Sequence, residues 1–253
     1  MNKFFQAFFV LLAISSQGNA APVKLNSNLD IGKLLPFSQS SSRSRYSKDL
    51  AGLYSVKAFQ ASHIKQPHND FNLLYQHAIA GQGELENITE LIALATGTTM
   101  LSSGVKSQPR ALSKINSKLA GHSELITDLA RTSIVAKDVP ALMNVFELIE
   151  QETQLVRIKN RFKSPGASGY RDLSLLVCLP KSKIVAEVQI HLEAFSVIKN
   201  GQEHDNYEQI QQIERKKLTE NRALNDIELA SINKLRKQSK HMYHTAWNQY
   251  LSA

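Results

Sequence analysis

The chain has 253 residues, of which 42% are hydrophobic, and it carries a net charge of +8 with a pI near 9.5. It can bury one hydrophobic core, alone or with a helical appendage. The single cysteine, Cys178, excludes an intrachain disulfide. The positive charge favours polyanionic partners such as nucleotides or nucleic acid, with general solubility as the alternative.

The first twenty residues have the pattern of a signal peptide. Lys3 supplies a positive charge, Phe4–Ile14 supplies an apolar segment too short to span a bilayer comfortably, and small residues lead up to Ala20. We predict cleavage after Ala20, with an uncleaved anchor as the alternative. The mature protein is then exported to the periplasm or the medium, without stable insertion in a membrane.

The next two segments differ in periodicity. Residues 21–48 are polar and serine-rich, which is typical of a flexible linker. Residues 49–104 show helical spacing of apolar residues, with Gly81 and Gly83 dividing the pattern before a stripe at 84–101. We therefore expect an N-terminal helical region. Its three histidines lack the spacing of a metal site.

Residues 105–253 alternate between helical and strand patterns. A helix is expected at 108–119, where basic residues recur every four positions, and a short helix is expected to run into a strand over 125–136. Asp138 predicts the cap of a helix at 140–151. Strands are expected at 154–160, 173–179 and 183–191, before a long helix from Thr219 to about Tyr250 with Trp247 as a packing anchor.

Three carboxylates stand out in this part of the chain. Asp128 is expected at the end of a helix, Asp172 follows a glycine-containing loop, and Glu187 lies within an apolar strand. A carboxylate inside a strand is unfavourable unless it is paired, solvated or bound to a cation. Two such groups on neighbouring strands would suit Mg²⁺. The alternative for Glu187 is a salt bridge to Arg157 or Lys159.

Cations and an aromatic side chain surround these carboxylates in the sequence. Arg157 and Lys159 share one face of their strand, where paired cations suit a phosphate chain better than a protein core. Tyr170, directly after Gly169, is expected to project from the loop as a stacking platform for a base. These features predict a nucleotide site.

Three segments together resemble a known family. RIKNRF, GYRDL and AEVQIHL, in this order and spacing, are similar to the R-x-K-D strand, G-Y loop and E-x-Q-[IV]-R-T strand of the RelA/SpoT-type alarmone synthetase domain. The resemblance is to a divergent branch and covers about residues 106–251, including an H-x-x-Y helix with His204 and Tyr207. The resemblance implies an α+β fold, with a mixed five-stranded sheet flanked by helices.

The family resemblance also implies an activity, the transfer of pyrophosphate from ATP to the 3′-hydroxyl of a purine nucleotide, and residue roles for it. Asp128 and Glu187 match the metal-binding and base positions, with Mg²⁺ as cofactor. Arg131 matches the motif arginine and would bind ATP phosphates, and Gln189 matches the strand glutamine and would contact the acceptor. Tyr170, with its neighbours Gly169 and Arg171, would hold the acceptor. The remaining cations would hold phosphates: Lys106, Arg110, Lys114, Arg157 and Lys159.

Three positions depart from the family pattern. Asn160 stands in place of an acid, Ser174 in place of a histidine, and His191-Leu192 in place of Arg-Thr. All three are expected to touch acceptor recognition or phosphate binding. The acceptor is therefore open between GDP or GTP, an adenine nucleotide and an RNA 3′ end. A non-catalytic nucleotide- or RNA-binding module and a structural protein are the competing interpretations.

The signal peptide conflicts with the use of ATP, because little ATP is present outside the cytoplasm. We therefore expect a secreted effector or toxin that acts after delivery into another cell.

Overall fold

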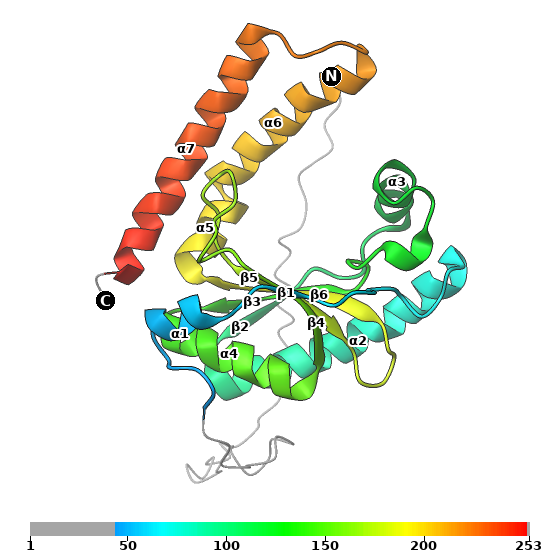
Figure 1. The fold of residues 1–253 in the computed structure, drawn as a ribbon, viewed down its shortest axis with the longest axis vertical. Helices are drawn as coiled ribbons and strands as arrows, with labels where there is room; N and C mark the ends of the chain where they lie inside the picture. Colours follow the sequence, from blue (N-terminus) through cyan, green and yellow to red (C-terminus); the bar gives the residue numbers. More distant parts are fainter. Residues whose placement is uncertain (1–43, 252–253) are drawn as a thin grey trace, which may run out of the picture. The chain divides into compact units, whose positions relative to one another are not determined.

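The computed structural model describes residues 44–251, with six strands in one mixed sheet of order β1-β4-β5-β6-β3-β2 (Figure 1). Strands β3 and β6 are parallel, and the other neighbouring strands are antiparallel. The strands are β1 (Phe59–Gln60), β2 (Thr99–Ser102), β3 (Arg131–Ala136), β4 (Gln154–Asn160), β5 (Leu173–Cys178) and β6 (Val185–Leu192).

The α+β class and the mixed sheet are confirmed, but the expected number of five strands is wrong. The edge strands β1 and β2 come from residues 49–104, which were expected to be helical. Strand β2 follows because the chain leaves its helix at Gly97, whose φ of 62° is left-handed and cheap for glycine. The N-terminal region thus contributes both edges of the sheet.

The helices are α1 (Leu50–Ser55), α2 (Phe71–Thr96), α3 (Gln108–Lys118), α4 (Val139–Glu152), α5 (Glu193–Asn200), α6 (Gln202–Thr219) and α7 (Asp226–Leu251). Helix α2 runs unbroken through Gly81 and Gly83. A Cβ at Gly81 would lie 3.0 Å from Ile184, so close packing accounts for that glycine. Thr219 ends α6 instead of starting the final helix, and Trp247 is buried against Phe162 as expected of an anchor.

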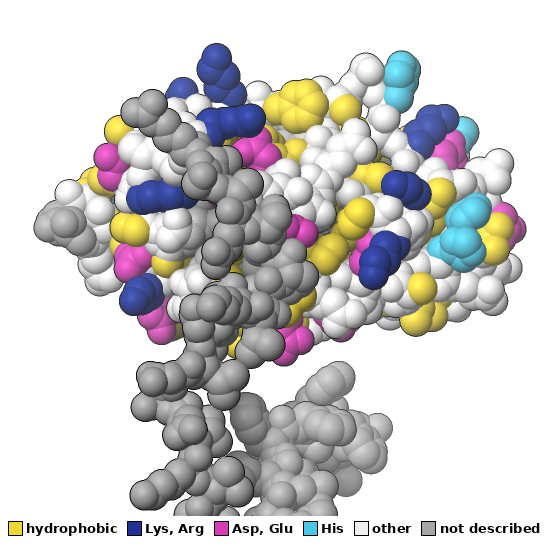
Figure 2. All heavy atoms as spheres, turned by 90° about the horizontal axis from the view of Figure 1, so that it is seen from below, with side chains coloured by type: hydrophobic (Ala, Val, Ile, Leu, Met, Phe, Trp, Pro, Cys, Tyr) yellow, Lys and Arg dark blue, Asp and Glu magenta, His cyan; other side chains and the backbone are white. Residues whose placement is uncertain are grey.

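One face of the sheet packs against helices α2 and α4 (Figure 1). Strand β6 directs Ala186, Val188, Ile190 and Leu192 to this face, and all four are at least 99% buried. Asp138 caps α4 as predicted, by accepting a hydrogen bond from the Ala141 N–H. In the part of this helical layer that Figure 2 shows, hydrophobic, basic and acidic side chains are interspersed.

The opposite face of the sheet lies between α3 and the helices α5, α6 and α7, and α6 and α7 form a hairpin (Figure 1). No helix between residues 44 and 251 has the length and hydropathy of a membrane span. The predicted signal peptide lies outside the described residues, as does most of the predicted linker. Residues 44–48 contact α4, where Arg45 pairs with Glu150 and Lys48 with Glu147.

Candidate active site

The face opposite α2 and α4 carries a row of charged side chains. Strand register aligns Arg131 of β3 with Glu187 of β6, Glu187 with Leu176 of β5, and Leu176 with Arg157 of β4. Side chains at aligned positions share one face of a sheet. Glu187 therefore lies beside Arg131, and Leu176 separates it from Arg157; both arginines are expected to bind phosphate.

The next row along the same face is also polar. It aligns Gln189 of β6 with Ser174 of β5, and Ser174 with Lys159 of β4. Beyond it, His191 of β6 lies beside Asp172, which precedes β5. Side chains alternate between the two faces along β6. Glu187 can therefore occupy an otherwise apolar strand, because its apolar neighbours Ala186 and Val188 face the core.

Glu187 is free of strong partners. Its Oε1 atom accepts long hydrogen bonds, 3.5 Å from Ser174 Oγ and 3.4 Å from Gln189 Nε2, and no cation lies within 4 Å of it among residues 44–251. The alternative of a salt bridge to Arg157 or Lys159 is therefore not realised. A carboxylate held this loosely can accept a proton or bind a cation.

The two arginines of the row have unsatisfied donors. The Nε atoms of Arg131 and Arg157 are buried and have no hydrogen-bond partner among the described residues. Burial lowers the pKa of Arg157, and Glu187 opposes that shift. Arg157 in turn lowers the pKa of Lys159, followed by burial. Buried donors without partners are costly, so an anionic ligand would stabilise this row.

Asp128 lies on a loop before β3, so its expected position at the end of a helix is wrong. Lys106 Nζ is 3.0 Å from Oδ2, and Lys114 Nζ is 2.9 Å from Oδ1. Burial acts to raise the pKa of Asp128, but the two lysines outweigh it, so the pKa is lowered. Lys114 of α3, and Lys106 just before that helix, are thus joined to the predicted metal position.

The described residues contain no cluster of three or more His, Cys, Asp or Glu side chains that could form a metal site. Mg²⁺ needs fewer protein ligands, because it often binds through one or two carboxylates plus substrate phosphates and waters. Glu187 fits such a role. Asp128 fits it once a lysine shifts from the carboxylate to a phosphate.

Tyr170 is held by its hydroxyl group. The hydroxyl donates to Asp172 Oδ2 at 3.0 Å and lies 3.3 Å from His191 Nδ1. Arg161 also binds both oxygens of Asp172, at 2.6 and 2.9 Å. Burial raises the pKa of Asp172 and lowers that of His191 to about 3, so this histidine is neutral. The ring therefore belongs to a fixed network and does not project freely from its loop.

The neighbours of Tyr170 serve the fold. Gly169 has φ 86°, and a Cβ there would lie 3.2 Å from Lys240 Cα, so this glycine lets the loop pack against α7. The guanidinium carbon of Arg171 lies 5.0 Å from the Trp247 ring centroid, and its Nη1 atom donates to the Phe162 carbonyl. Neither residue is among those that line the cavity beside Tyr170.

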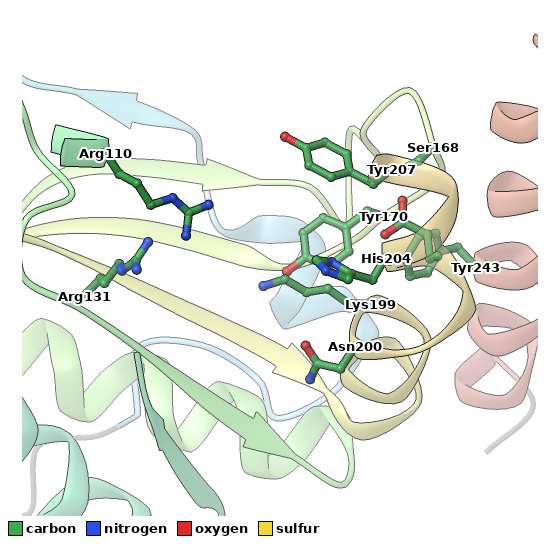
Figure 3. Close-up of a pocket in the computed structure, with 10 residues that line it drawn as sticks. Arg110, Arg131, Ser168, Tyr170, Lys199, Asn200, His204, Tyr207 and Tyr243 are labelled. Atoms are coloured by element: carbon green, nitrogen blue, oxygen red, sulfur yellow. The ribbon is translucent and has the colours of Figure 1, made fainter. Parts of the chain in front are cut away.

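A cavity of about 510 Å³ opens beside Tyr170 (Figure 3). Arg110 and Arg131 lie at one end, and Tyr170 and Lys199 at the other. Both residues of the predicted H-x-x-Y helix, His204 and Tyr207, line it. The lining residues that were not predicted are Ser168, Lys199, Asn200, Glu203 and Tyr243.

Lys199 of α5 could have been noticed in the sequence, because it is a lysine one residue after the apolar Ile198 of an amphipathic helix. Its contacts could not have been predicted from the sequence, because they involve Gln189 and Tyr170 from other segments.

The three departures from the family pattern have different positions. Asn160 faces away from the charged row, and its amide donates to the carbonyls of Leu53 and Val56 at 2.7 and 3.1 Å. A carboxylate could not donate these bonds, so the amide serves the packing of α1, and an effect of Asn160 on the acceptor is not expected. Ser174 and His191, by contrast, contact Glu187 and Tyr170.

Two buried glutamines from the N-terminal region hold the backbone beneath the site. Gln82 of α2 bonds both the N–H and the carbonyl of Arg131, at 2.8 and 3.0 Å. Gln66 likewise bonds both backbone groups of Val185, at 2.9 and 2.8 Å, and also the Ile126 carbonyl at 2.8 Å. The starts of β3 and β6 and the loop of Asp128 are therefore fixed by side chains that precede residue 105.

No family model matches the chain, and no curated protein is significantly similar to it in sequence. Solved structures of other proteins are similar to this chain in fold. The Type VI effector Tas1, solved with its immunity protein, is 19% identical with a TM-score of 0.52, over 69% of this chain and 94% of that chain. A GTP pyrophosphokinase family protein from Streptococcus pneumoniae is 15% identical with a TM-score of 0.50, over 70% and 91%. The described residues thus have the fold of a RelA/SpoT-type synthetase domain.

Proposed function

We propose that the protein is a pyrophosphokinase that transfers the β,γ-pyrophosphate of ATP to the 3′-hydroxyl of a purine nucleotide. The observation that carries the proposal is the row in which the loosely held Glu187 lies between Arg131 and Arg157, whose buried Nε–H groups lack partners. This arrangement offers a proton acceptor and charge neutralisation on one face of the sheet.

In the proposed reaction the acceptor hydroxyl oxygen attacks the β-phosphorus of ATP, and the bond from this phosphorus to the oxygen it shares with the α-phosphate breaks. AMP leaves with that bond's electron pair, and Glu187 takes the hydroxyl proton. Arg131 and Arg157 stabilise the charge of the transferred group. Lys106, Arg110 and Lys114 approach from the α3 side, where they bind the donor phosphates.

Mg²⁺ would neutralise phosphate charge and orient the ATP phosphates, with Asp128 as a protein ligand and with Glu187 as a second ligand in the alternative to its role as base. A donor phosphate can then take the place of the Asp128 carboxylate as the partner of Lys106 and Lys114. Lys159 of β4 lies in the neighbouring row and assists phosphate binding from the acceptor side.

The acceptor that the family resemblance favours is GDP or GTP, and adenine nucleotides or an RNA 3′ end are the alternatives. The test is incubation of the purified chain with ATP, Mg²⁺ and each acceptor, followed by chromatography of the products. We expect AMP and a pyrophosphorylated acceptor in equal amounts. If neither product forms with any acceptor, the enzymatic proposal is wrong.

Glu187→Gln keeps the shape of the side chain and removes its charge, and we expect it to lower the rate by about 10²- to 10⁴-fold while ATP still binds. Glu193→Gln is the matched control, because Glu193 is exposed at the start of α5. Equal rates in both variants would exclude Glu187 as the base.

A non-catalytic nucleotide-binding module is the second candidate. The observation that favours it is the pairing of Asp128 with two lysines, which occupies the predicted metal ligand. ATP binding without product formation, unchanged by Glu187→Gln, would support this candidate.

We also propose that the protein is exported and acts as an effector in another cell, on the basis of the sequence of residues 1–20. The amino-terminal sequence of the protein recovered from medium and periplasm tests this. Export predicts a mature chain that begins at Ala21, whereas an intact chain confined to the cytoplasm would contradict it.

A further inference from the structure

Lys199 is an inward-facing cation without a counter-charge. It extends from α5 into the 510 Å³ cavity, and its Nζ atom donates to the neutral Gln189 amide oxygen at 2.8 Å (Figure 3). No carboxylate lies within 4 Å of it among the described residues. Burial lowers its pKa, and the more distant Asp172 and Glu187 oppose that shift. A cation that is partly desolvated and unpaired is costly unless a ligand brings an anion to it.

The position of Lys199 also limits what Tyr170 can do. The Lys199 Nζ atom lies 5.6 Å from the Tyr170 ring centroid, and the Arg161 guanidinium carbon lies 5.9 Å from it. The Tyr243 ring packs edge-on at 5.6 Å. Cations near an aromatic face compete with a stacked base for that face. Arg161 is already paired with Asp172, so Lys199 is the cation at this face that attracts an anionic group, although Glu203 lines the same cavity.

The cavity separates its cations into two groups. Arg110 and Arg131 lie at the end nearer the charged row, and Lys199 lies at the opposite end (Figure 3). Two separate cationic positions can bind two anions, one from each substrate of a transfer reaction. Arg110 and Arg131 suit the ATP phosphates, which leaves Lys199 for the second substrate.

We infer that Lys199 binds a phosphate group of the acceptor, so that the acceptor is recognised by its 5′-phosphates at this end of the cavity. This inference rests on the proposed function for the identity of the ligand as an acceptor nucleotide. It makes Lys199 a binding residue that selects nucleotides over nucleosides. Discrimination between purine bases is then expected to be weaker than discrimination by phosphate.

Calorimetric titration of the full chain with GDP and with guanosine, without ATP, tests the inference. Lys199→Met keeps most of the apolar stem and removes the charge, and we expect GDP to bind roughly 10- to 100-fold more weakly. Guanosine binding should stay within about 2-fold, because no phosphate contact is lost. Lys237→Met, an exposed lysine on α7 that does not line the cavity, should change neither affinity.

The inference is wrong if Lys199→Met weakens GDP and guanosine binding by the same factor, or weakens neither. It is also wrong if Arg110→Met abolishes GDP binding while Lys199→Met has no effect, because GDP then occupies the other end of the cavity. These results are independent of turnover. GDP binding that depends on Lys199, in a chain that releases no AMP, would support the anion site and contradict the proposed enzyme.

Discussion

The two faces of the central sheet are made by alternate residues of the same strands, yet they differ in almost every physical property. On β6, Ile190 is fully buried under the α2 and α4 layer, and its neighbours Gln189 and His191 point to the polar face. The apolar face gains stability from close packing, and the polar face leaves arginine donors unsatisfied. One face therefore stabilises the fold, while the other holds polar groups that destabilise it until a ligand binds.

The largest effect is expected from placing a charge on the apolar face. Ile190→Asp would bury a carboxylate without a partner, at a cost of at least about 4 kcal/mol, and we expect an unfolded or aggregated chain. Circular dichroism and urea unfolding would measure it. Glu193→Asp, an exposed control on α5, should unfold like the parent chain. A stable Ile190→Asp variant would mean that the α2 and α4 layer is loosely packed.

Substitution of the adjacent residue, Gln189, should lower the rate and leave the stability nearly unchanged. Gln189→Leu removes the amide that links Lys199 to Glu187, by bonds of 2.8 and 3.4 Å, and we expect a roughly 30-fold lower rate, about 2 kcal/mol. Its unfolding midpoint in urea should change little, because the polar face contributes little packing. The rate of AMP release and the urea midpoint are measured for the same variant. An unchanged rate with a lowered midpoint would contradict the assignment of stability to the apolar face and of function to the polar face.

His191 lies on the polar face but is only 2% exposed, so its burial should make the stability of the protein depend on pH. Burial lowers its pKa from 6.5 to about 3, so between these values the unfolded chain binds the extra proton. Its contribution to stability is complete above pH 6.5 and falls as the pH drops toward 3, by about 2 kcal/mol at pH 5. Urea unfolding at pH 7.5 and pH 5 should show a smaller loss in His191→Gln. An equal loss in both chains would assign the pH dependence to other groups.

The smallest effect is expected at two glycines that differ in surroundings. Gly169→Ala meets a left-handed backbone and the Lys240 Cα at 3.2 Å, and we expect a loss of about 1 to 2 kcal/mol. Gly83→Ala lies in open space on α2, whose helical backbone suits alanine, so a gain of about 0.5 to 1 kcal/mol is expected. Thermal unfolding compares the two, and the same sign in both would contradict the assigned role of Gly169.

Local patterns in the sequence predicted much of this molecule. The three strands at 154–160, 173–179 and 183–191 and the helix capped by Asp138 depend on neighbours in the chain, and they match β4, β5, β6 and α4 closely. The continuity of α2 through Gly81 was not predicted, because it depends on tertiary packing against Ile184, and the helix end at the left-handed Gly97 was also missed. Thr219 was misassigned for a different reason, since threonine at a helix end can belong to either helix.

Many residues of the site were predictable from the sequence, but their contacts were less so. Glu187, Arg131 and Arg157 were selected from motifs, and strand register brings them into one row. Arg171 was also selected, but its guanidinium packs on Trp247, which lies 76 positions away by number and could not be paired with it from the sequence. Lys199 was missed because its importance comes from an absent counter-charge.

The glutamine contacts beneath the site have a consequence for folding order. Gln66 bonds Val185 across 119 positions, and Gln82 bonds Arg131 across 49. Contacts that distant form late, because long loops must close first. The chain must therefore be synthesised nearly to its last strand before the charged row can assemble, and the row is expected to be absent from any partly folded intermediate. A growing or unfolded chain would then lack the proposed site.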